Sequence, residues 1–118
     1  MSTRVILAID DRPHELGRLR ECASAHGCML LIHVFRDIDS AVEETAKIGP
    51  EIVLVGHGLS SFPITGSHVI RALRQAGYNG IIAGNSGGGS APFEADGVAI
   101  DFAVDRNEKK LRNLLEEN

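Results

Sequence analysis

The chain has 118 residues, of which 43% are hydrophobic and 24% charged, a composition typical of one globular domain that buries a core without disulfides. Its 12 Lys and Arg against 16 Asp and Glu give a formal net charge of −4 without a cationic run, so we expect no nucleic-acid partner. The first apolar run is interrupted at Asp10, too early for a signal peptide or a membrane span, so we expect a cytoplasmic protein with no membrane partner.

Short apolar runs alternate with amphipathic segments in the first half of the chain. The runs are rich in β-branched residues and bounded by turn residues, which predicts buried strands, and the segments between them predict helices. Pro13 suits the first turn of the first helix, Gly27 its end, and Asp37 can cap the second helix. The predicted elements are a strand at 4–9, a helix at 13–26, a strand at 29–34, a helix at 38–48 and a strand at 52–55.

The second half continues the alternation but contains two glycine-rich segments. The polar segment 56–67 predicts a loop, and the segment 85–90 has too much glycine to be helical. Only a short fourth helix fits after it, and Asn107 can cap the last helix. The predicted elements here are a loop at 56–67, a helix at 68–76, a strand at 80–84, a helix at 91–95, a strand at 99–104 and a helix at 108–117.

Five strand–helix units with short connections require parallel strands and right-handed crossovers. We therefore predict a single domain, 1–118, with a doubly wound three-layer α/β sandwich of the flavodoxin-like kind. Its five parallel strands follow the order 2-1-3-4-5, and its fourth helix is shortened or lost. In such a sheet, ligands and chemistry sit just outside the carboxyl ends of the strands.

Two of the predicted strands end in different ways at this edge. The first closes on the acidic pair Asp10 and Asp11, whereas the third closes on Gly56, His57 and Gly58. The sequence therefore predicts an acidic site to which the third strand contributes no carboxylate.

Four segments match one family in their order and spacing. They are an apolar strand closed by the acidic pair (5–13), a strand with its lead-in (50–55), a helix with the turn that follows it (69–78) and a strand ending (101–104). Together they resemble the receiver domains of two-component response regulators, the CheY-like superfamily, over essentially the whole chain. The resemblance implies a flavodoxin-like fold and a role in signalling.

The departures from the family pattern fall at its functional positions. The resemblance implies that a strand-three aspartate helps the acidic pair to hold a divalent cation and accepts a phosphoryl group, yet Gly56 and then His57 stand there. The family's strand-four Thr/Ser and strand-five Lys fall at Asn85 and Asp105, and its switch aromatic at Phe102. Phosphoryl transfer needs an oxygen nucleophile and cationic charge. We therefore predict a degenerate pseudo-receiver that cannot be phosphorylated on aspartate.

The acidic pair has two interpretations. In the first, one carboxylate caps the first helix and the other is solvated or pairs with Arg12 or Arg106. In the second, Asp10, Asp11 and Asp105 bind Mg²⁺ weakly through three oxygens at the strand ends. No other cofactor is expected.

His57 also has two interpretations. Imidazole suits a metal ligand or a phosphoryl acceptor, but we favour a loop histidine that packs over the strand end. His33 lies in a predicted buried strand, so we expect a core histidine with satisfied hydrogen bonds. The spacing of Cys22 and Cys28 matches no metal or redox motif.

The second glycine-rich segment is a weak candidate for a ligand loop. Its backbone N–H groups could cradle an anion, although it lacks the lysine of a P-loop. We favour the alternative of a mobile loop beside the shortened fourth helix. The residues concerned are Gly84, Asn85, Ser86, Gly87 and Gly88.

The candidate residues favour binding over catalysis. No serine has an identifiable base, and adjacent Asp10 and Asp11 lack the separation of an acid–base pair, so we expect no enzyme. We predict a phosphorylation-independent signalling module that binds a histidine kinase, a phosphotransfer protein, another regulator or a second copy of itself. The alternative is a flavodoxin-like domain that binds a cobalamin-, flavin- or quinone-type ligand at the carboxyl ends of the strands.

Overall fold

The computed structural model describes residues 3–61 and 63–117, and a sheet of five parallel strands forms its centre. The strand order β2-β1-β3-β6-β7 confirms the predicted order 2-1-3-4-5. Ile9 near the end of β1 lies opposite Val55 at the end of β3, so the two strands finish at the same edge. The strands are β1 (Arg4–Asp10), β2 (Cys28–Val34), β3 (Ile52–Val55), β6 (Ile81–Gly84) and β7 (Phe102–Ala103).

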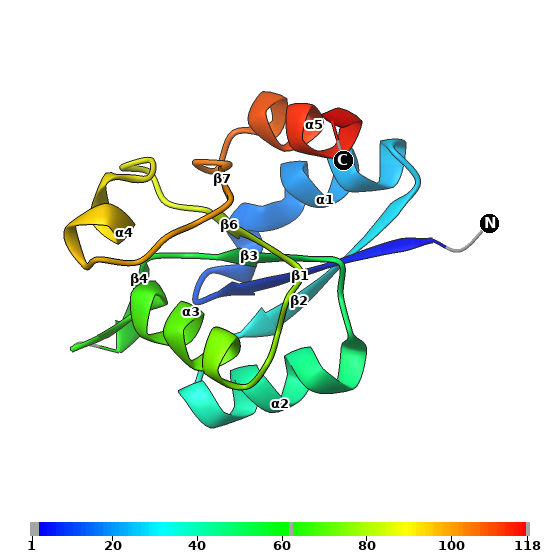
Figure 1. The fold of residues 1–118 in the computed structure, drawn as a ribbon. Helices are drawn as coiled ribbons and strands as arrows, with labels where there is room; N and C mark the ends of the chain where they lie inside the picture. The colour runs from blue at the N-terminus through cyan, green and yellow to red at the C-terminus, as the bar shows by residue number, and fades with distance from the viewer. Residues whose placement is uncertain (1–2, 62, 118) are drawn as a thin grey trace.

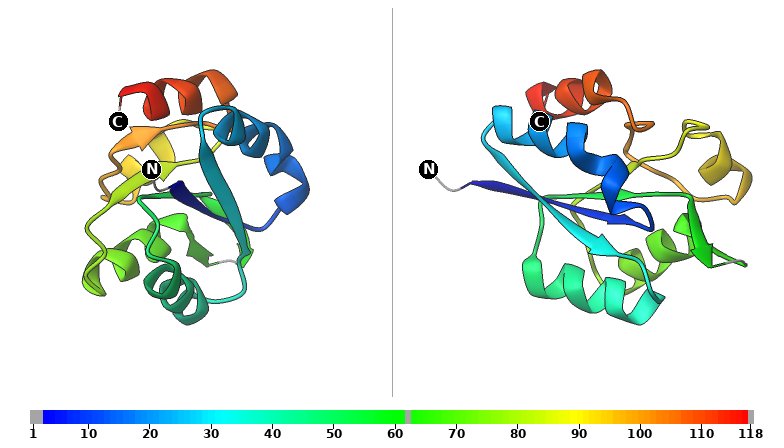
Figure 2. Two further views of the ribbon diagram at one scale, coloured as in Figure 1. Left: turned by 90° about the vertical axis from the view of Figure 1, so that its right-hand side faces the viewer. Right: turned by 180° about the vertical axis from the view of Figure 1, so that it is seen from behind.

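Helices cover both faces of the sheet (Figure 1). The helices α1 (Gly17–Ala25) and α5 (Glu108–Glu117) pack together on one face, and α2 (Ile38–Ile48) and α3 (Gly66–Gln75) pack on the other. The short α4 (Ala91–Ala95) follows β6, and Figure 2 shows the same layers from the side and from behind. This arrangement confirms the predicted three-layer α/β sandwich with a short fourth helix. None of the described helices has the length and apolarity needed to cross a bilayer.

The central strands are buried on both sides, as expected for parallel strands between two helix layers. One apolar cluster joins the sheet to α1 and α5, and it includes Ile6 and Ile52. A second cluster joins the opposite side to α2, α3 and Phe93 of α4, and it includes Val53 and Val55. Because these five side chains have no exposed surface, the core fixes where the strands end and so positions the edge at which a site is predicted.

Two helix boundaries differ from the predictions. The predicted helix at 13–26 is divided into a 3-10 turn, η1 (Pro13–Leu16), and α1, which ends before Gly27 with its φ of +71°. The third helix begins at Gly66, two residues earlier than predicted. The reason is local, because the Thr65 N–H donates a hydrogen bond to Nδ1 of His68 at 3.1 Å.

Two strand predictions are also corrected. Part of the predicted loop 56–67 forms an antiparallel hairpin, β4 (Gly58–Ser61) and β5 (Ile64–Thr65), which projects beside α3 in Figure 1. The predicted strand at 99–104 is reduced to the two residues of β7. There the Asp101 carboxylate accepts a hydrogen bond from the Ile82 N–H at 2.9 Å, so a side chain replaces part of the backbone ladder.

Candidate functional site

The carboxyl ends of β1, β3 and β6 form one rim that brings the main predicted site residues together. Asp10 ends β1, Gly56 follows β3 and Asn85 follows β6. The Gly56 N–H donates to the Ile9 carbonyl at 3.1 Å, and the Asn85 N–H donates to the Val55 carbonyl at 2.9 Å. Asp10 and Asn85 are each only 1% exposed, so two buried polar side chains flank a glycine.

The two carboxylates of the acidic pair have different surroundings. Asp10 Oδ1 accepts a hydrogen bond from the Arg12 N–H at 3.0 Å, and Asp11 Oδ2 lies 3.9 Å from the Arg12 guanidinium. Burial raises the pKa of Asp10 despite the Arg12 bond, and a hydrogen bond with Asp11 adds to the rise. Burial also acts to raise the pKa of Asp11, but hydrogen bonds from Ser60 and with Asp10 hold it below its ordinary value.

The helix-capping interpretation of the acidic pair is wrong. Neither η1 nor α1 has a side-chain cap at its N-terminus. The Asp10 carboxylate instead bonds two residues ahead within the loop, a turn that acidic residues commonly make. The pairing interpretation is confirmed, because both carboxylates lie within ion-pair distance of an arginine.

Gly56 leaves the centre of the rim without a side chain. A β-carbon added to Gly56 would lie 3.1 Å from Asp10 Oδ2 and 3.6 Å from Leu59 Cδ2. Leu59 comes from the hairpin strand β4 and is only 2% exposed. The space beside Gly56 is therefore bordered by a carboxylate and an apolar side chain, and β3 contributes no side-chain oxygen to it.

The hairpin formed by β4 and β5 is attached to this rim. Ser60 has a left-handed φ of +55°, and its hydroxyl donates a hydrogen bond to Asp11 Oδ2. At the other end, the Gly66 N–H donates to the His57 carbonyl at 2.8 Å. A β-carbon at Gly66 would lie 1.9 Å from the Gly56 carbonyl oxygen, so glycine is required for this approach. Sequence reasoning missed Ser60, because it reaches Asp11 only through the hairpin.

After β7 the chain passes through two left-handed residues, Asp105 and Arg106, which both have a φ of +57°. This conformation costs roughly 1 kcal/mol or more for each non-glycine residue, so other contacts must stabilise the turn. The Arg106 N–H donates to Oδ1 of the buried Asn85 at 2.7 Å, and the Lys110 ammonium pairs with Asp105 Oδ2. Asn85 thus stabilises the turn.

The same turn places a positive charge at the rim. One Arg106 nitrogen lies 3.8 Å from Asp10 Oδ2, and another bonds to Glu15. Glu15 also lies 3.5 Å from the Arg12 guanidinium. The end of the fifth strand therefore brings a positive charge as well as the carboxylate of Asp105, because Arg106 follows Asp105 directly and its side chain reaches the acidic pair.

The rim does not match the divalent-cation site that the resemblance implies. Within residues 3–61 and 63–117, no three His, Cys, Asp or Glu side chains are grouped so that they could hold a metal ion. Asp10, Asp11 and Asp105 each have one buried oxygen without a hydrogen-bond partner in this part of the chain, but the other oxygen of Asp105 pairs with Lys110. The three-carboxylate site is thus not assembled, and the alternative of weak Mg²⁺ binding by Asp10 and Asp11 alone stays untested.

His57 belongs to a polar cluster that holds α4 in place. Its Nε2 lies 2.8 Å from Asp96 Oδ2, and its ring packs edge-on against Phe93 with centroids 5.2 Å apart. The Ser67 hydroxyl donates to the same Asp96 oxygen at 2.7 Å, and Arg71 donates to the Asp96 carbonyl. The bonds to His57 and Ser67 lower the pKa of Asp96. These contacts match the packing interpretation of His57.

The predicted ligand loop begins with a packing contact. A β-carbon at Gly84 would lie 2.7 Å from the Phe93 ring, so this glycine allows α4 to pack closely. Farther along, the Gly88 N–H donates to Ser86 Oγ at 3.1 Å, while Gly87 is exposed. Anion binding by this loop stays a prediction.

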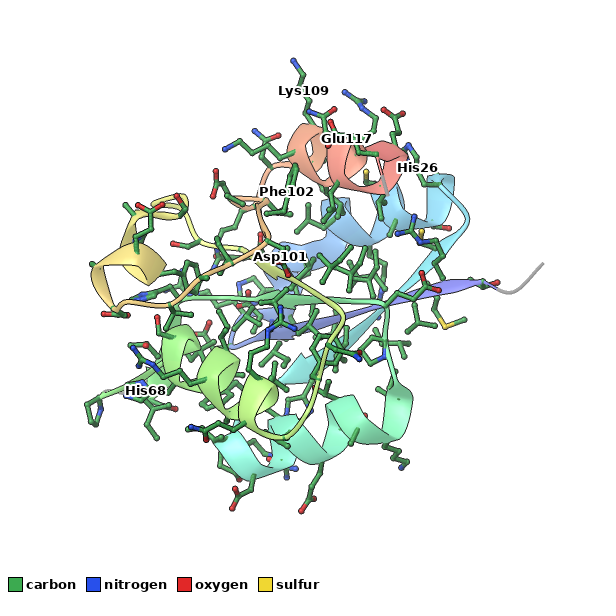
Figure 3. The ribbon with its side chains drawn as sticks, viewed as in Figure 1. His26, His68, Asp101, Phe102, Lys109 and Glu117 are labelled. Carbon is green, nitrogen blue, oxygen red and sulfur yellow. The ribbon has the colours of Figure 1, made fainter. Side chains whose placement is uncertain are left out.

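The remaining candidates lie away from the rim. Phe102 is half-buried and packs against the core cluster beneath α5, next to Asp101 (Figure 3). The expectation of a satisfied His33 is wrong, because its buried Nε2 has no hydrogen-bond partner among the described residues. Cys22 and Cys28 are free thiols.

A cavity of about 880 Å³ lies at the opposite edge of the sheet. The C-terminal ends of α2 and α3 and the beginning of β6 line it. Two ion pairs lie at its border, Arg4 with Glu51 at 3.1 Å and Arg74 with Asp101 at 3.0 Å. This cavity is distinct from the rim at which a small-molecule site was predicted.

No protein-family model and no curated protein sequence matches the chain, but solved structures do. A receiver domain (CheY-like) from Methylobacillus flagellatus has a TM-score of 0.77 at 16% identity, over 98% of both chains. A signal receiver domain from Bermanella marisrubri has a TM-score of 0.76 at 18% identity, also over 98% of both. A LuxR-family two-component response regulator from Aurantimonas sp. SI85-9A1 has a TM-score of 0.75 at 21% identity, over 98% of this chain and 84% of that one. The chain therefore has the fold of these receiver domains.

Proposed function

We propose that this single domain is a receiver-like signalling module that works without aspartate phosphorylation. Its fold, shared with receiver domains over nearly the whole chain, supports the receiver-like part of the proposal. The module acts by binding another protein rather than by catalysis. The partner is a histidine kinase, a phosphotransfer protein, another regulator or a second copy of the chain.

The observation that carries the proposal is the glycine in the centre of the rim. Formation of an acyl phosphate requires a carboxylate oxygen that attacks phosphorus. Gly56 has no such oxygen, and the Asp10 oxygen that faces its α-carbon lies within reach of the Arg106 charge. Asp10 is also 1% exposed, so a phosphoryl donor has poor access to it.

A receiver-like module without a phosphoryl group stays in the conformational state that its own contacts favour. A ligand shifts a two-state equilibrium only through its different affinities for the two states. Because aspartate phosphorylation supplies no such difference here, binding of the partner depends on the abundance of the two proteins rather than on a phosphorylation signal.

The first experiment measures phosphorylation directly. The protein is incubated with acetyl phosphate or phosphoramidate and Mg²⁺, and its intact mass is measured, with the receiver domain from Methylobacillus flagellatus treated in parallel. We expect no added phosphoryl mass on this chain. A base-labile adduct mapped to Asp10 or Asp11 would contradict the proposal, and an acid-labile adduct on His57 would replace it with histidine phosphorylation.

The second experiment tests binding to another protein. ¹⁵N-labelled protein is titrated with purified histidine-kinase and phosphotransfer domains, and self-association is measured by sedimentation. We expect saturable binding to one of these partners that acetyl phosphate does not alter. If the purified protein instead shows the absorbance of a bound corrin, flavin or quinone, the small-molecule alternative replaces protein binding.

A further inference from the structure

Two of the departures from the receiver pattern, Asn85 and Asp105, lie together in space with Arg106, the residue that follows Asp105. Asn85, Asp105 and Arg106 meet in the turn after β7, and Arg106 reaches towards Asp10, whose free oxygen faces Gly56. If these residues only removed the ability to be phosphorylated, there would be no reason for them to contact one another. Their arrangement therefore points to a common structural role.

The backbone of the turn directs the Arg106 side chain. Two successive non-glycine residues with a φ of +57° are unfavourable, and they persist only where the surroundings stabilise them. The bond from the Arg106 N–H to Asn85 Oδ1, at 2.7 Å, provides this support from a side chain that is 99% buried. Lys110 pairs with Asp105 and neutralises the other charge of the turn.

The Arg106 side chain ends at the acidic pair. Its guanidinium lies 3.8 Å from the Asp10 oxygen that has no hydrogen-bond partner in the described chain, and it bonds to Glu15 of η1. A nearby positive charge stabilises the ionised form of a buried carboxylate, and a guanidinium supplies this charge as a permanent part of the chain. On the other side of the pair, the Ser60 hydroxyl donates to Asp11.

We propose that Arg106 is a built-in cation that takes the electrostatic role of a divalent metal at the acidic pair. This inference deepens the proposed function, on which it rests. The guanidinium neutralises Asp10, and its bond to Glu15 joins the turn after β7 to η1. Divalent cations are therefore excluded, and the rim stays in one state regardless of the Mg²⁺ concentration.

The test compares Mg²⁺ binding by the wild-type chain and by Arg106→Ala, using amide NMR shifts and calorimetry. We expect no saturable binding by the wild type at millimolar Mg²⁺. Removing the guanidinium exposes Asp10 and Asp11 as oxygen ligands, so Arg106→Ala should bind Mg²⁺ at least about tenfold more tightly, with shifts at both aspartates. Adding Asp10→Asn to this variant should remove the gained affinity.

Lys109→Ala is the matched control. It removes the same charge three residues away, from an exposed side chain that lies on the outer side of α5 in Figure 3. We expect this variant to behave like the wild type towards Mg²⁺. If Arg106→Ala does not fold, Arg106→Gln, which keeps most of the side-chain length, takes its place.

Two outcomes would overturn the proposal that Arg106 replaces a divalent metal. Wild-type protein that binds Mg²⁺ as tightly as the Arg106 variant shows that the guanidinium does not exclude metal. A folded Arg106 variant that gains no affinity shows that Arg106 is not the reason for the exclusion. Either result leaves the proposed function intact as long as acetyl phosphate produces no aspartyl phosphate, so the two failures are distinguishable.

Discussion

Asp10 shows how a single residue sets the energetics of the rim. It is the one charged side chain among the described residues that is fully buried, at 1% exposed, and one of its oxygens has no hydrogen-bond partner in that part of the chain. Burying a carboxylate costs free energy unless a charge and hydrogen bonds compensate. Arg106 at 3.8 Å and the Arg12 N–H at 3.0 Å compensate only in part, because burial still raises the pKa of Asp10.

We predict that Asp10→Asn raises the free energy of unfolding at neutral pH by about 1 kcal/mol. The amide keeps an oxygen that can accept the Arg12 N–H bond, but it removes the buried charge. Because the pKa of Asp10 is higher in the folded state, its contribution to stability is complete below the unfolded pKa and is lost as the pH rises through the folded pKa. Urea unfolding between about pH 4 and about pH 8 should show this loss in the wild type and a flatter profile in the variant.

The substitution Asp11→Asn is the control, because it should change the free energy of unfolding in the opposite direction. The folded state lowers the pKa of Asp11, mainly through the Ser60 hydroxyl once burial is overcome. Its contribution is therefore present above the unfolded pKa and is lost as the pH falls through the folded pKa. We expect Asp11→Asn to lower the free energy of unfolding at neutral pH. If both variants shift stability in the same direction, the different roles of the two carboxylates are disproved.

At the scale of elements, α4 depends on tertiary contacts. Its five residues are too few for a helix that is stable by itself. Phe93 has no exposed surface and packs into the core, while Asp96, the residue that ends the helix, bonds to His57 and Ser67. The Asp96 carboxylate therefore attaches α4 to His57 in the segment after β3 and to Ser67 in α3.

We predict that Asp96→Ala speeds amide hydrogen exchange in α4 several-fold while the central strands keep their protection. The reason is that the substitution removes the acceptor shared by His57 and Ser67 without disturbing Phe93. The pKa of Asp96 is lowered, so in the wild type these bonds are complete above its unfolded pKa and weaken as the pH falls through the folded pKa. Exchange measured by NMR in the wild type and the variant checks the prediction.

Asp39→Ala provides the comparison for this experiment. Asp39 is exposed in the first turn of α2 and carries the same charge. We expect this variant to leave exchange in α4 unchanged. Equal acceleration of α4 by both substitutions would mean that general charge, and not the Asp96 bonds, stabilises the helix.

At the scale of the whole molecule, the sequence predicts the strands and helices that alternate along the chain. It does not predict the contacts between residues that lie far apart in the sequence. Five apolar runs with short connections were enough for the strand order and the layers. Arg106 was predicted only as one of two alternative partners of the acidic pair. The turn that directs its side chain was not predictable, because it depends on two left-handed residues and on Asn85, 21 positions earlier. The bond from Ser60 to Asp11, 49 positions apart, required the hairpin, whose polar residues give no strand pattern. The lack of a carboxylate after the third strand was predictable, because it follows directly from the identity of Gly56 in the sequence.

The response of the whole fold to a phosphoryl mimic follows from the same contacts. We predict that beryllofluoride with Mg²⁺ leaves the amide spectrum of the chain unchanged, including α4, β7 and α5. Beryllofluoride mimics a phosphoryl group only when a carboxylate oxygen coordinates it, and Gly56 offers none.

The receiver domain from Methylobacillus flagellatus, titrated under the same conditions, serves as the comparison of equal fold. Saturable shifts in this chain that begin at Asp10 and extend to α4 would mean that another carboxylate substitutes for the missing one. The rim would then retain two states, because a ligand with different affinities for them had moved the equilibrium.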